Sequence, residues 1–104
     1  MDGIQSFGLA LIQALQDEDA MVASLAVNAL VKVGSPAVPA LIDVAQAAPR
    51  SARIHALRAL AEIRDHRAIP TLMKVMGEDS ALLQHWAKEG LERLGLDMVY
   101  IKPV

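Results

Sequence analysis

The sequence has no cysteine, very few aromatic residues (one Trp, one Tyr and one Phe) and no long apolar run. Without cysteine the chain can form no disulfide, thiolate metal site or iron–sulfur cluster, and it has no thiol nucleophile. The scarcity of aromatic residues argues against a β-rich core, which favours aromatic and branched side chains. No apolar stretch approaches the roughly 20 residues of a membrane span. We therefore expect a cytoplasmic protein with no membrane partner.

The charge is nearly balanced, with 10 basic against 12 acidic residues and a net charge of −2. Such a chain lacks the strongly basic surface that is typical of nucleic-acid-binding proteins, so we expect no nucleic-acid partner. The two halves of the chain nevertheless differ in sign. Residues 1–49 hold five acids against Lys32 alone, a balance of −4, whereas residues 50–104 hold nine bases against seven acids, a balance of +2.

Alanine and the spacing of the apolar residues indicate helices. Alanine, the strongest helix former, occupies 18 of the 104 positions. Apolar or small residues recur at i, i+3, i+4 and i+7, the spacing of one helix face, in six successive stretches. These stretches are Gly8–Leu15, Ala26–Val33, Val38–Ala45, Ala56–Ile63, Ile69–Met76 and Ala87–Leu94.

The six stretches form three copies of one pattern, displaced by 30 or 31 residues. Periods of this size are typical of solenoids, in which each unit buries its apolar face only against its neighbours. We predict an all-α fold, a right-handed α-solenoid of three helical hairpins with six helices. The single domain, 1–104, divides into repeat one (4–34), repeat two (35–64), repeat three (65–95) and a C-terminal tail (96–104).

Stacking the three repeats aligns residues of the same kind in columns, which predicts how the helices pack. The aligned columns are Leu11, Leu41 and Leu72; Ala26, Ala56 and Ala87; Ala29, Ala59 and Gly90; Leu30, Leu60 and Leu91; and Val33, Ile63 and Leu94. Alanine and glycine let neighbouring helices approach closely, and leucine fills the space above and below.

The segments between the stretches carry the residues that begin and end helices. Acidic and hydroxyl residues accept hydrogen bonds from the first free N–H groups of a helix. We therefore expect N-caps from the acidic run 17–19 and from four further residues, and helix ends at two glycines. The four residues are Ser35, Ser51, Asp65 and Ser80, and the two glycines are Gly34 and Gly95.

The motif Ala-Val/Ile-Pro-x-Leu, at residues 37–41 and 68–72, and the pair Ala52-Arg53 resemble the short HEAT-like repeats of the phycobilisome-lyase type, in the armadillo-like class. The first repeat departs from the motif, because Leu9 replaces its proline. The resemblance implies that the second helix of each hairpin lines a concave face. It also implies that Arg53 pairs with an acid in a neighbouring turn, either Glu78 or Asp79, with Asp17 or Asp19 as the alternative.

At 100° per residue, three positions in each second helix lie opposite the core columns. We name these nine positions the candidate stripe and predict that they bind a partner. A merely solvated helix face is the alternative. The stripe comprises Ser24, Asn28, Val31, Ile54, Arg58, Ala61, His85, Glu89 and Glu92.

The sequence offers little catalytic chemistry. His85 and Glu89 stand at i and i+4 with His55 one helix away, but His55 is predicted to point sideways, and a tight metal site needs three or four converging ligands. We expect no metal, no cofactor and no catalytic residue, and hence no enzyme. The predicted function is a protein-binding or scaffolding module whose partner is another protein. The alternatives are an accessory subunit of a phycobilin (chromophore) lyase-like complex, as the resemblance implies, or the terminal piece of a longer HEAT solenoid.

The two ends of the stack carry further apolar residues. Leu25 is left at the N-terminal edge unless the first helix or a second copy of the chain covers it, and we expect the first helix to fold over it. The tail beyond Gly95 alternates Tyr100 and Lys102 with apolar residues, a pattern typical of extended chain. The tail either caps the last hairpin or docks a partner. A homodimer through the N-terminal edge or the tail is one arrangement.

Overall fold

The computed structural model describes residues 3–47, 49–78 and 80–96, with side chains from residue 8 onward. The described residues form six α-helices and two 3-10 helices, and no strand. The bounds are α1 (Gly3–Ala14), α2 (Ala20–Val33), η1 (Ser35–Ala37), α3 (Val38–Ala47), α4 (Arg50–Ile63), η2 (His66–Ala68), α5 (Ile69–Met76) and α6 (Ala81–Arg93).

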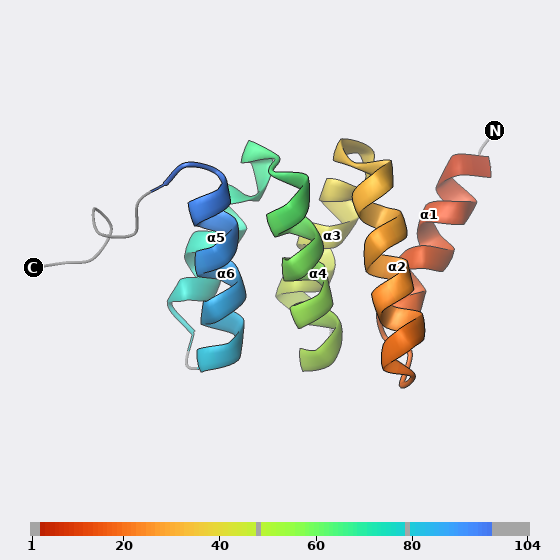
Figure 1. The fold of residues 1–104 in the computed structure, drawn as a ribbon, viewed down its shortest axis with the longest axis horizontal. Helices are drawn as coiled ribbons and strands as arrows, with labels where there is room; N and C mark the ends of the chain where they lie inside the picture. Colours follow the sequence, from red (N-terminus) through yellow and green to blue (C-terminus); the bar gives the residue numbers. More distant parts are fainter. Residues whose placement is uncertain (1–2, 48, 79, 97–104) are drawn as a thin grey trace, which may run out of the picture.

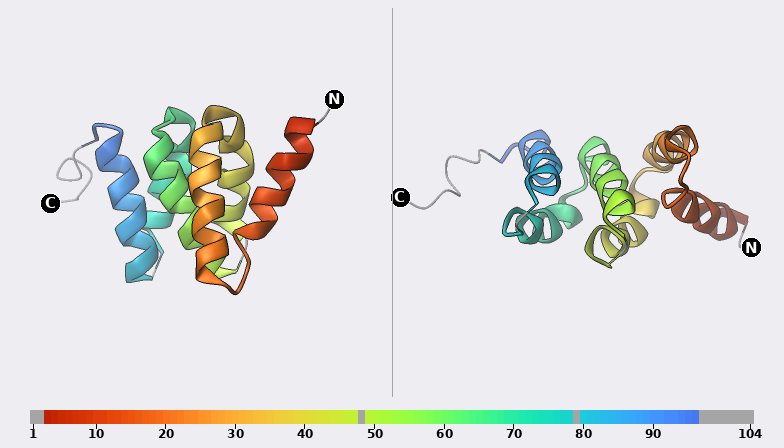
Figure 2. Two further views of the ribbon diagram at one scale, coloured as in Figure 1. Left: turned by 45° about the vertical axis from the view of Figure 1, so that its right-hand side comes forward. Right: turned by 90° about the horizontal axis from the view of Figure 1, so that it is seen from below.

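The helices form three hairpins arranged in a row (Figure 1). Helices α1 and α2, α3 and α4, and α5 and α6 pair within hairpins, while α2, α4 and α6 contact one another in sequence between hairpins. Seen along the helices, α2, α4 and α6 form one layer and α1, α3 and α5 the other (Figure 2). This arrangement confirms the predicted all-α solenoid of hairpins.

Two of the matched columns are buried in all three repeats, whereas in two others the first-repeat members, Leu11 and Ala29, are only half-buried. The leucines of α2, α4 and α6 at positions 30, 60 and 91 are at most 1% exposed, and the alanines at 26, 56 and 87 are also buried. The small column permits close approach: a Cβ atom on Gly90 would lie 3.0 Å from Leu72 Cδ1 and 3.6 Å from the Cα of Ala61. Helix α6 therefore packs tightly on both α5 and α4, as the columns predict.

Three of the predicted N-caps are confirmed. The Asp19 carboxylate accepts a hydrogen bond from the Met21 N–H at 2.9 Å, and so begins α2. The Ser80 hydroxyl accepts one from the Leu83 N–H at 3.3 Å and begins α6. Asp65 caps the 3-10 turn η2 that leads into α5. Each cap satisfies a donor that the first helical turn would otherwise leave free.

The other two predicted caps are wrong. Ser35 lies inside the 3-10 turn η1, whose N-cap is Gly34, and its side chain makes no capping bond. Ser51 is the second residue of α4, which begins at Arg50 after Pro49. A proline lies near each serine, Pro36 directly after Ser35 and Pro49 two residues before Ser51. Its fixed φ preorganises the backbone for the turn without a side-chain acceptor.

A residue with positive φ follows the second helix of every hairpin. Gly34 and Gly95 have φ values of 78° and 87°, as expected of glycine at a helix end. The equivalent residue of repeat two is Arg64, whose φ is 60° and ψ 43°, the left-handed conformation. This ending could not be predicted from the sequence, because the column holds arginine in place of glycine.

Arg53 joins the second hairpin to the third. Its guanidinium donates to the Glu78 carboxylate at 2.6 Å and to the backbone oxygen of Ala45 at 2.6 Å. This confirms one of the predicted pairings; Asp79 lies outside the described residues. The bond to Arg53 lowers the pKa of Glu78, since it stabilises the charged carboxylate.

Three more polar contacts tie the same two hairpins together. The Gln46 amide donates to the Thr71 hydroxyl at 3.0 Å, Arg50 donates to Ser80 at 2.7 Å, and the Arg67 guanidinium donates to the backbone oxygen of Ser35 at 2.8 Å. Between the first hairpin and the rest, the described residues show no side-chain hydrogen bond. The first hairpin is therefore held by apolar packing within the described region.

No single helix in the described ranges is long and apolar enough to cross a membrane. One pair, Ala20–Val33 with Ser35–Ala47, satisfies the length and composition criteria together, but it is bent by 118°.

Candidate protein-binding face

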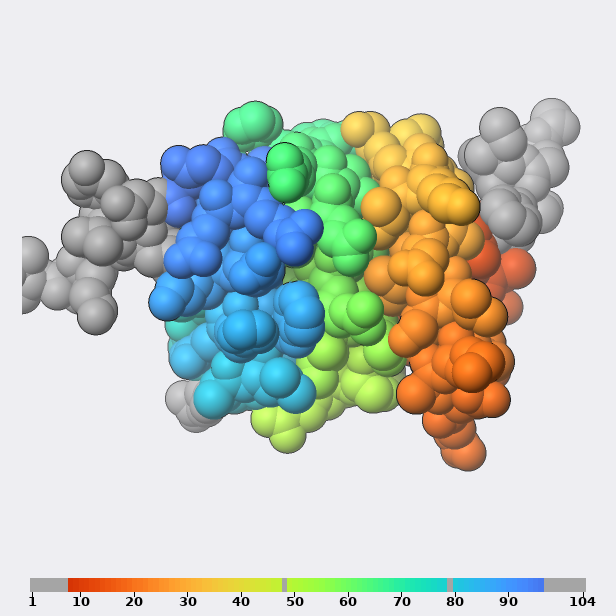
Figure 3. All heavy atoms as spheres, in the orientation of Figure 1, coloured from red at the N-terminus to blue at the C-terminus, as the bar shows by residue number. Residues whose placement is uncertain are grey.

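The candidate stripe lies on the layer formed by α2, α4 and α6, which faces the viewer in Figure 3. Its residues differ in accessibility. Three members are exposed: Asn28, His85 and Glu92. Five are half-buried: Ser24, Val31, Ile54, Arg58 and Glu89. The face is thus open mainly over the polar and charged members of the stripe.

Ala61 is the one member of the candidate stripe that is buried and cannot contact a partner. It is only 2% exposed and lies where α6 approaches α4 through Gly90. Val31 and Ile54 also pack against the core with part of their surface. The prediction failed at Ala61 because it considered each helix alone, at 100° per residue. In the structure α6 lies close to α4 and buries residues on the side of α4 that faces it.

An aromatic and cationic cluster lies between α4 and α6. The guanidinium carbon of Arg58 stands 5.7 Å from the centre of the Trp86 ring, a cation–π contact. The His85 ring meets the same tryptophan edge to face, with ring centres 5.0 Å apart. We name Arg58, His85 and Trp86 the α4–α6 cluster. Trp86 falls outside the predicted stripe, although the sequence places it in the flanking column of Leu25 and His55.

The charges around the cluster are fixed by burial and pairing. Burial and the nearby Arg58 charge lower the pKa of His55, so this imidazole is neutral at pH 7. Its Nδ1 is buried without a hydrogen-bond partner in the described part of the chain. Glu89 accepts a hydrogen bond from Arg93 at 2.9 Å, one helical turn along α6. Trp86 is therefore the centre of the cluster, with Arg58 and His85 against its ring.

Within the described residues, no group of three or more His, Asp or Glu side chains is placed to hold a metal ion. His85 instead packs its ring on Trp86.

Residues 9–95 match the sequence profile of HEAT repeats. The chain belongs to the HEAT-repeat family. It is 36% identical over 87 residues to bilin biosynthesis protein RpcF of Synechococcus sp. (strain WH8020). The aligned segment covers 83% of this chain and 42% of that relative. It is 39% identical over 72 residues to phycocyanobilin lyase subunit beta of Pseudanabaena tenuis (strain PCC 7409), covering 69% of this chain and 26% of that protein.

These relatives confirm the resemblance to HEAT-like repeats of the lyase type. The matched segment spans less than half the length of either relative. Both are thus longer proteins, to which this HEAT-repeat chain corresponds in part.

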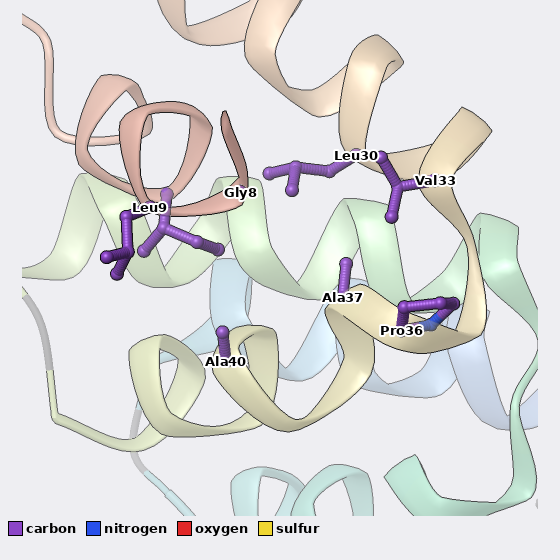
Figure 4. A pocket seen from close by; sticks show the side chains of 8 residues that line it. Gly8, Leu9, Leu30, Val33, Pro36, Ala37 and Ala40 are labelled. Atoms are coloured by element: carbon purple, nitrogen blue, oxygen red, sulfur yellow. The ribbon is translucent and has the colours of Figure 1, made fainter. Parts of the chain in front are cut away.

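An apolar pocket lies between the first two HEAT hairpins. It has a volume of about 450 Å³ and lies between α1, the C-terminal part of α2 and the start of α3 (Figure 4). Its cause is visible in the columns, since Gly8 occupies the position that Val38 and Ile69 hold in the later repeats. Val38 is fully buried, whereas a Cβ on Gly8 would meet no atom within 4 Å. The lining residues are Gly8, Leu9, Ile12, Leu30, Val33, Pro36, Ala37 and Ala40.

The N-terminal edge of the HEAT stack exposes apolar side chains of α2. Met21 is 71% exposed, Leu25 61% and Val22 37%. The expectation that the first helix folds over Leu25 is therefore wrong. Helix α1 packs behind α2, in the other layer, because its apolar face is directed at the core of its own hairpin (Figure 2).

Proposed function

We propose that this HEAT-repeat chain is a non-catalytic module that binds another protein through the face of α2, α4 and α6. The observation that carries the proposal is the α4–α6 cluster, in which the only tryptophan of the chain lies beside Arg58 and His85 on this face. The other exposed members of the candidate stripe are Asn28 on α2 and Glu92 on α6.

The chemistry of the cluster suits a protein partner. Tryptophan and arginine are enriched among the residues that dominate binding energy, because they combine a large apolar area with directed hydrogen bonds. A guanidinium that rests on a ring keeps its edge donors free for a carboxylate or a backbone oxygen of the partner. The exposed carboxylate of Glu92, on the same helix as Trp86, favours a cationic residue of the partner.

Capture of partners from native lysate tests this proposal. The wild-type chain, Arg58→Glu and Glu89→Arg are immobilised and the retained proteins compared. We expect a protein that is retained by the wild type and lost with Arg58→Glu. The matched control is Lys74→Glu, which reverses an exposed cation on α5 in the other layer and should leave binding unchanged. Binding that ignores both stripe substitutions contradicts the proposed face.

A second candidate function is that of an accessory subunit in a bilin lyase-like complex. The relatives named as a bilin biosynthesis protein and a phycocyanobilin lyase subunit favour it. In this case the partner is a second lyase chain, and the module supplies a docking surface. Absorbance spectra of phycocyanobilin, recorded with this chain alone and with candidate partner chains, test the idea. A spectral change that requires the chain supports it, and unchanged spectra in every mixture contradict it.

The apolar pocket does not match a tetrapyrrole. A linear tetrapyrrole carries two carboxylates, and the eight described residues that line the pocket carry no charge. Buried carboxylates need a paired cation. We therefore assign no bilin contact to this pocket, and a bilin-related role would depend on surfaces contributed by the partner.

The ends of the stack complete the proposal. As the chain spans less than half of its relatives, a terminal piece of a longer solenoid fits the open N-terminal edge. Residues 97–104 of the C-terminal tail lie outside the described residues. Deletion of this segment distinguishes its two predicted roles: a large loss of stability supports capping, whereas intact stability with lost association supports docking or dimerisation through the tail.

A further inference from the structure

Two arginines at the start of α4 hold the third hairpin at fixed positions. Arg50, the first residue of α4, donates to the hydroxyl of Ser80 at 2.7 Å. Arg53, the fourth residue, donates to the carboxylate of Glu78 at 2.6 Å. Ser80 is the N-cap of α6, and Glu78 lies two residues before it. One second helix thus supplies two cations, and the turn before the next second helix supplies their acceptors.

The turn before α2 has carboxylates at both acceptor positions. Asp19 is the N-cap of α2, as Ser80 is the N-cap of α6, and Asp17 lies two residues before it. Both aspartates are exposed, and neither pairs with a cation within residues 8–47, 49–78 and 80–96. The N-terminal edge therefore presents the acceptors for a preceding hairpin that the described residues do not contain.

The side of α2 next to these carboxylates corresponds to a covered side of the later second helices. On α6 this side contains Gly90, where an added Cβ would lie 3.6 Å from a backbone atom of α4. The equivalent residue of α2, Ala29, is half-buried. Val22 is 37% exposed, whereas its equivalents Ala52 and Leu83 are 0% and 3% exposed. In the later repeats a preceding second helix covers this side.

Donors and acceptors occur together at the interfaces between hairpins. Between the first and second hairpins, α2 has Ala20 and Ala23 at the two arginine positions. The turn before α4 correspondingly has Ala47 and Pro49 at the two acceptor positions. The interface without arginines thus also lacks polar acceptor side chains, and the interface with arginines has them. Carboxylates at the N-terminal edge therefore indicate a preceding helix that carries arginines.

The far end of the stack does not provide such a helix. Ala81 and Gln84 of α6 occupy the arginine positions, and the exposed Lys88 occupies the position of the buried Leu57. A second copy docked end to end would leave both carboxylates without a cation and bring a lysine to the apolar side of α2. The arginine-bearing helix α4 is unavailable in a second copy, because α6 packs on it.

We propose that the N-terminal edge docks the last hairpin of a separate HEAT-repeat protein, whose second helix has arginine as its first and fourth residues. Asp19 and Asp17 accept hydrogen bonds from these arginines, and the apolar Leu25, which is 61% exposed, packs on the same helix. The inference rests on the proposed function in taking the partner to be another protein. It uses a different surface, so Arg58→Glu should leave this contact unchanged, and either surface can fail without the other.

A donor variant of this chain serves as the probe. Ala81→Arg, Gln84→Arg and Lys88→Leu give α6 the residues that α4 has at these positions, and Leu25→Lys blocks the N-terminal edge of the donor itself. Mixed with the wild-type chain, the donor should form a one-to-one heterodimer in size exclusion coupled to light scattering. The wild-type chain alone should remain monomeric. Circular dichroism checks that the donor has the helical content of the wild type.

Variants of the receiving chain identify the contact. Asp17→Lys should weaken the heterodimer at least about tenfold, since it replaces an attractive pair by a repulsive one. The matched control is Asp43→Lys, which reverses an exposed acid on α3 in the other layer and should leave the affinity unchanged. A folded donor that forms no heterodimer, a heterodimer that ignores Asp17→Lys, or a wild-type dimer that Leu25→Lys abolishes overturns the proposal.

A covalent extension distinguishes a separate protein from a longer chain. A copy of residues 35–64 inserted before residue 5 places the natural Arg50 and Arg53 ahead of the N-terminal edge. The extended chain should melt above the wild type, and Asp17→Lys should lower its Tm more than that of the wild type. Docking that occurs only in the extended chain, and not with the separate donor, assigns the hairpin to the same polypeptide and overturns the proposal.

Discussion

Two helix-interior glycines should respond in opposite directions to the same substitution. Gly8 lies in α1 beside the apolar pocket, and a Cβ there would meet no atom within 4 Å. At Gly90 in α6, the added Cβ would lie 3.0 Å and 3.4 Å from the two methyl groups of Leu72. Neither glycine has a positive φ, so an L-amino acid is tolerated by both backbones.

The expected free energies follow from these contacts. In a helix interior, alanine is favoured over glycine by about 1 kcal/mol. Gly8→Ala should show this gain in full, and Gly8→Val should stabilise by about 2 kcal/mol, because each further buried carbon contributes about 0.8 kcal/mol less the rotamer cost of branching. For Gly90→Ala, overpacking costs about 1–3 kcal/mol and offsets or outweighs the same gain.

Thermal unfolding followed by far-UV circular dichroism measures these changes. For a chain of this size, 1 kcal/mol corresponds to about 4–8 °C in Tm, so Gly8→Val should melt clearly above the wild type and Gly90→Ala should not. Gly8→Ala and Gly90→Ala are matched in propensity and differ only in their surroundings. Equal stabilisation by the two, or destabilisation by Gly8→Val, would refute both the pocket and the column that explains it.

Three further predictions concern single sites. Arg64→Gly should stabilise by about 1 kcal/mol in urea unfolding, because glycine adopts positive φ without the steric cost that arginine bears. Folded Glu78 has a lowered pKa through Arg53, so its stabilising contribution is present above pH 4.5, its ordinary value, and is lost as the pH falls below it; Glu78→Gln should flatten the acid limb of a stability-against-pH profile. Leu60→Ala should cost about 2–5 kcal/mol through a cavity and Ala56→Leu about 1–3 kcal/mol through overpacking, and unchanged melting curves in both would contradict the column assignment.

The periodic features of the fold could be predicted from the sequence because they repeat. The leucine and alanine columns identify the buried side of each helix three times over, so one irregular residue does not hide the pattern. The Arg53–Glu78 pair could also be predicted, because the family resemblance implies that this arginine pairs with an acid in a neighbouring turn. The acid at position 19 and the serine at position 80 precede their helices directly, where only local geometry matters.

The features that were missed depend on distances between elements. Ala61 is buried because α6 approaches α4 closely at Gly90, and the periodicity of a single helix contains no such information. The stacking of Trp86 on Arg58 likewise joins two helices whose relative rotation is set by the whole core. In the sequence Gly8 is an ordinary member of a helix face. Only the comparison with the buried Val38 at the equivalent position shows that the missing side chain of Gly8 leaves a pocket.

The fluorescence of Trp86 provides the most direct test of the proposed binding face, since this is the only tryptophan in the chain. A partner retained in the capture experiment is titrated into the protein, with the partner's own emission subtracted. If the α4–α6 cluster is the contact, the emission of Trp86 should shift and saturate at the stoichiometry of binding, and Arg58→Glu should weaken the titration. Binding that is detected by calorimetry but leaves Trp86 emission unchanged would contradict the account.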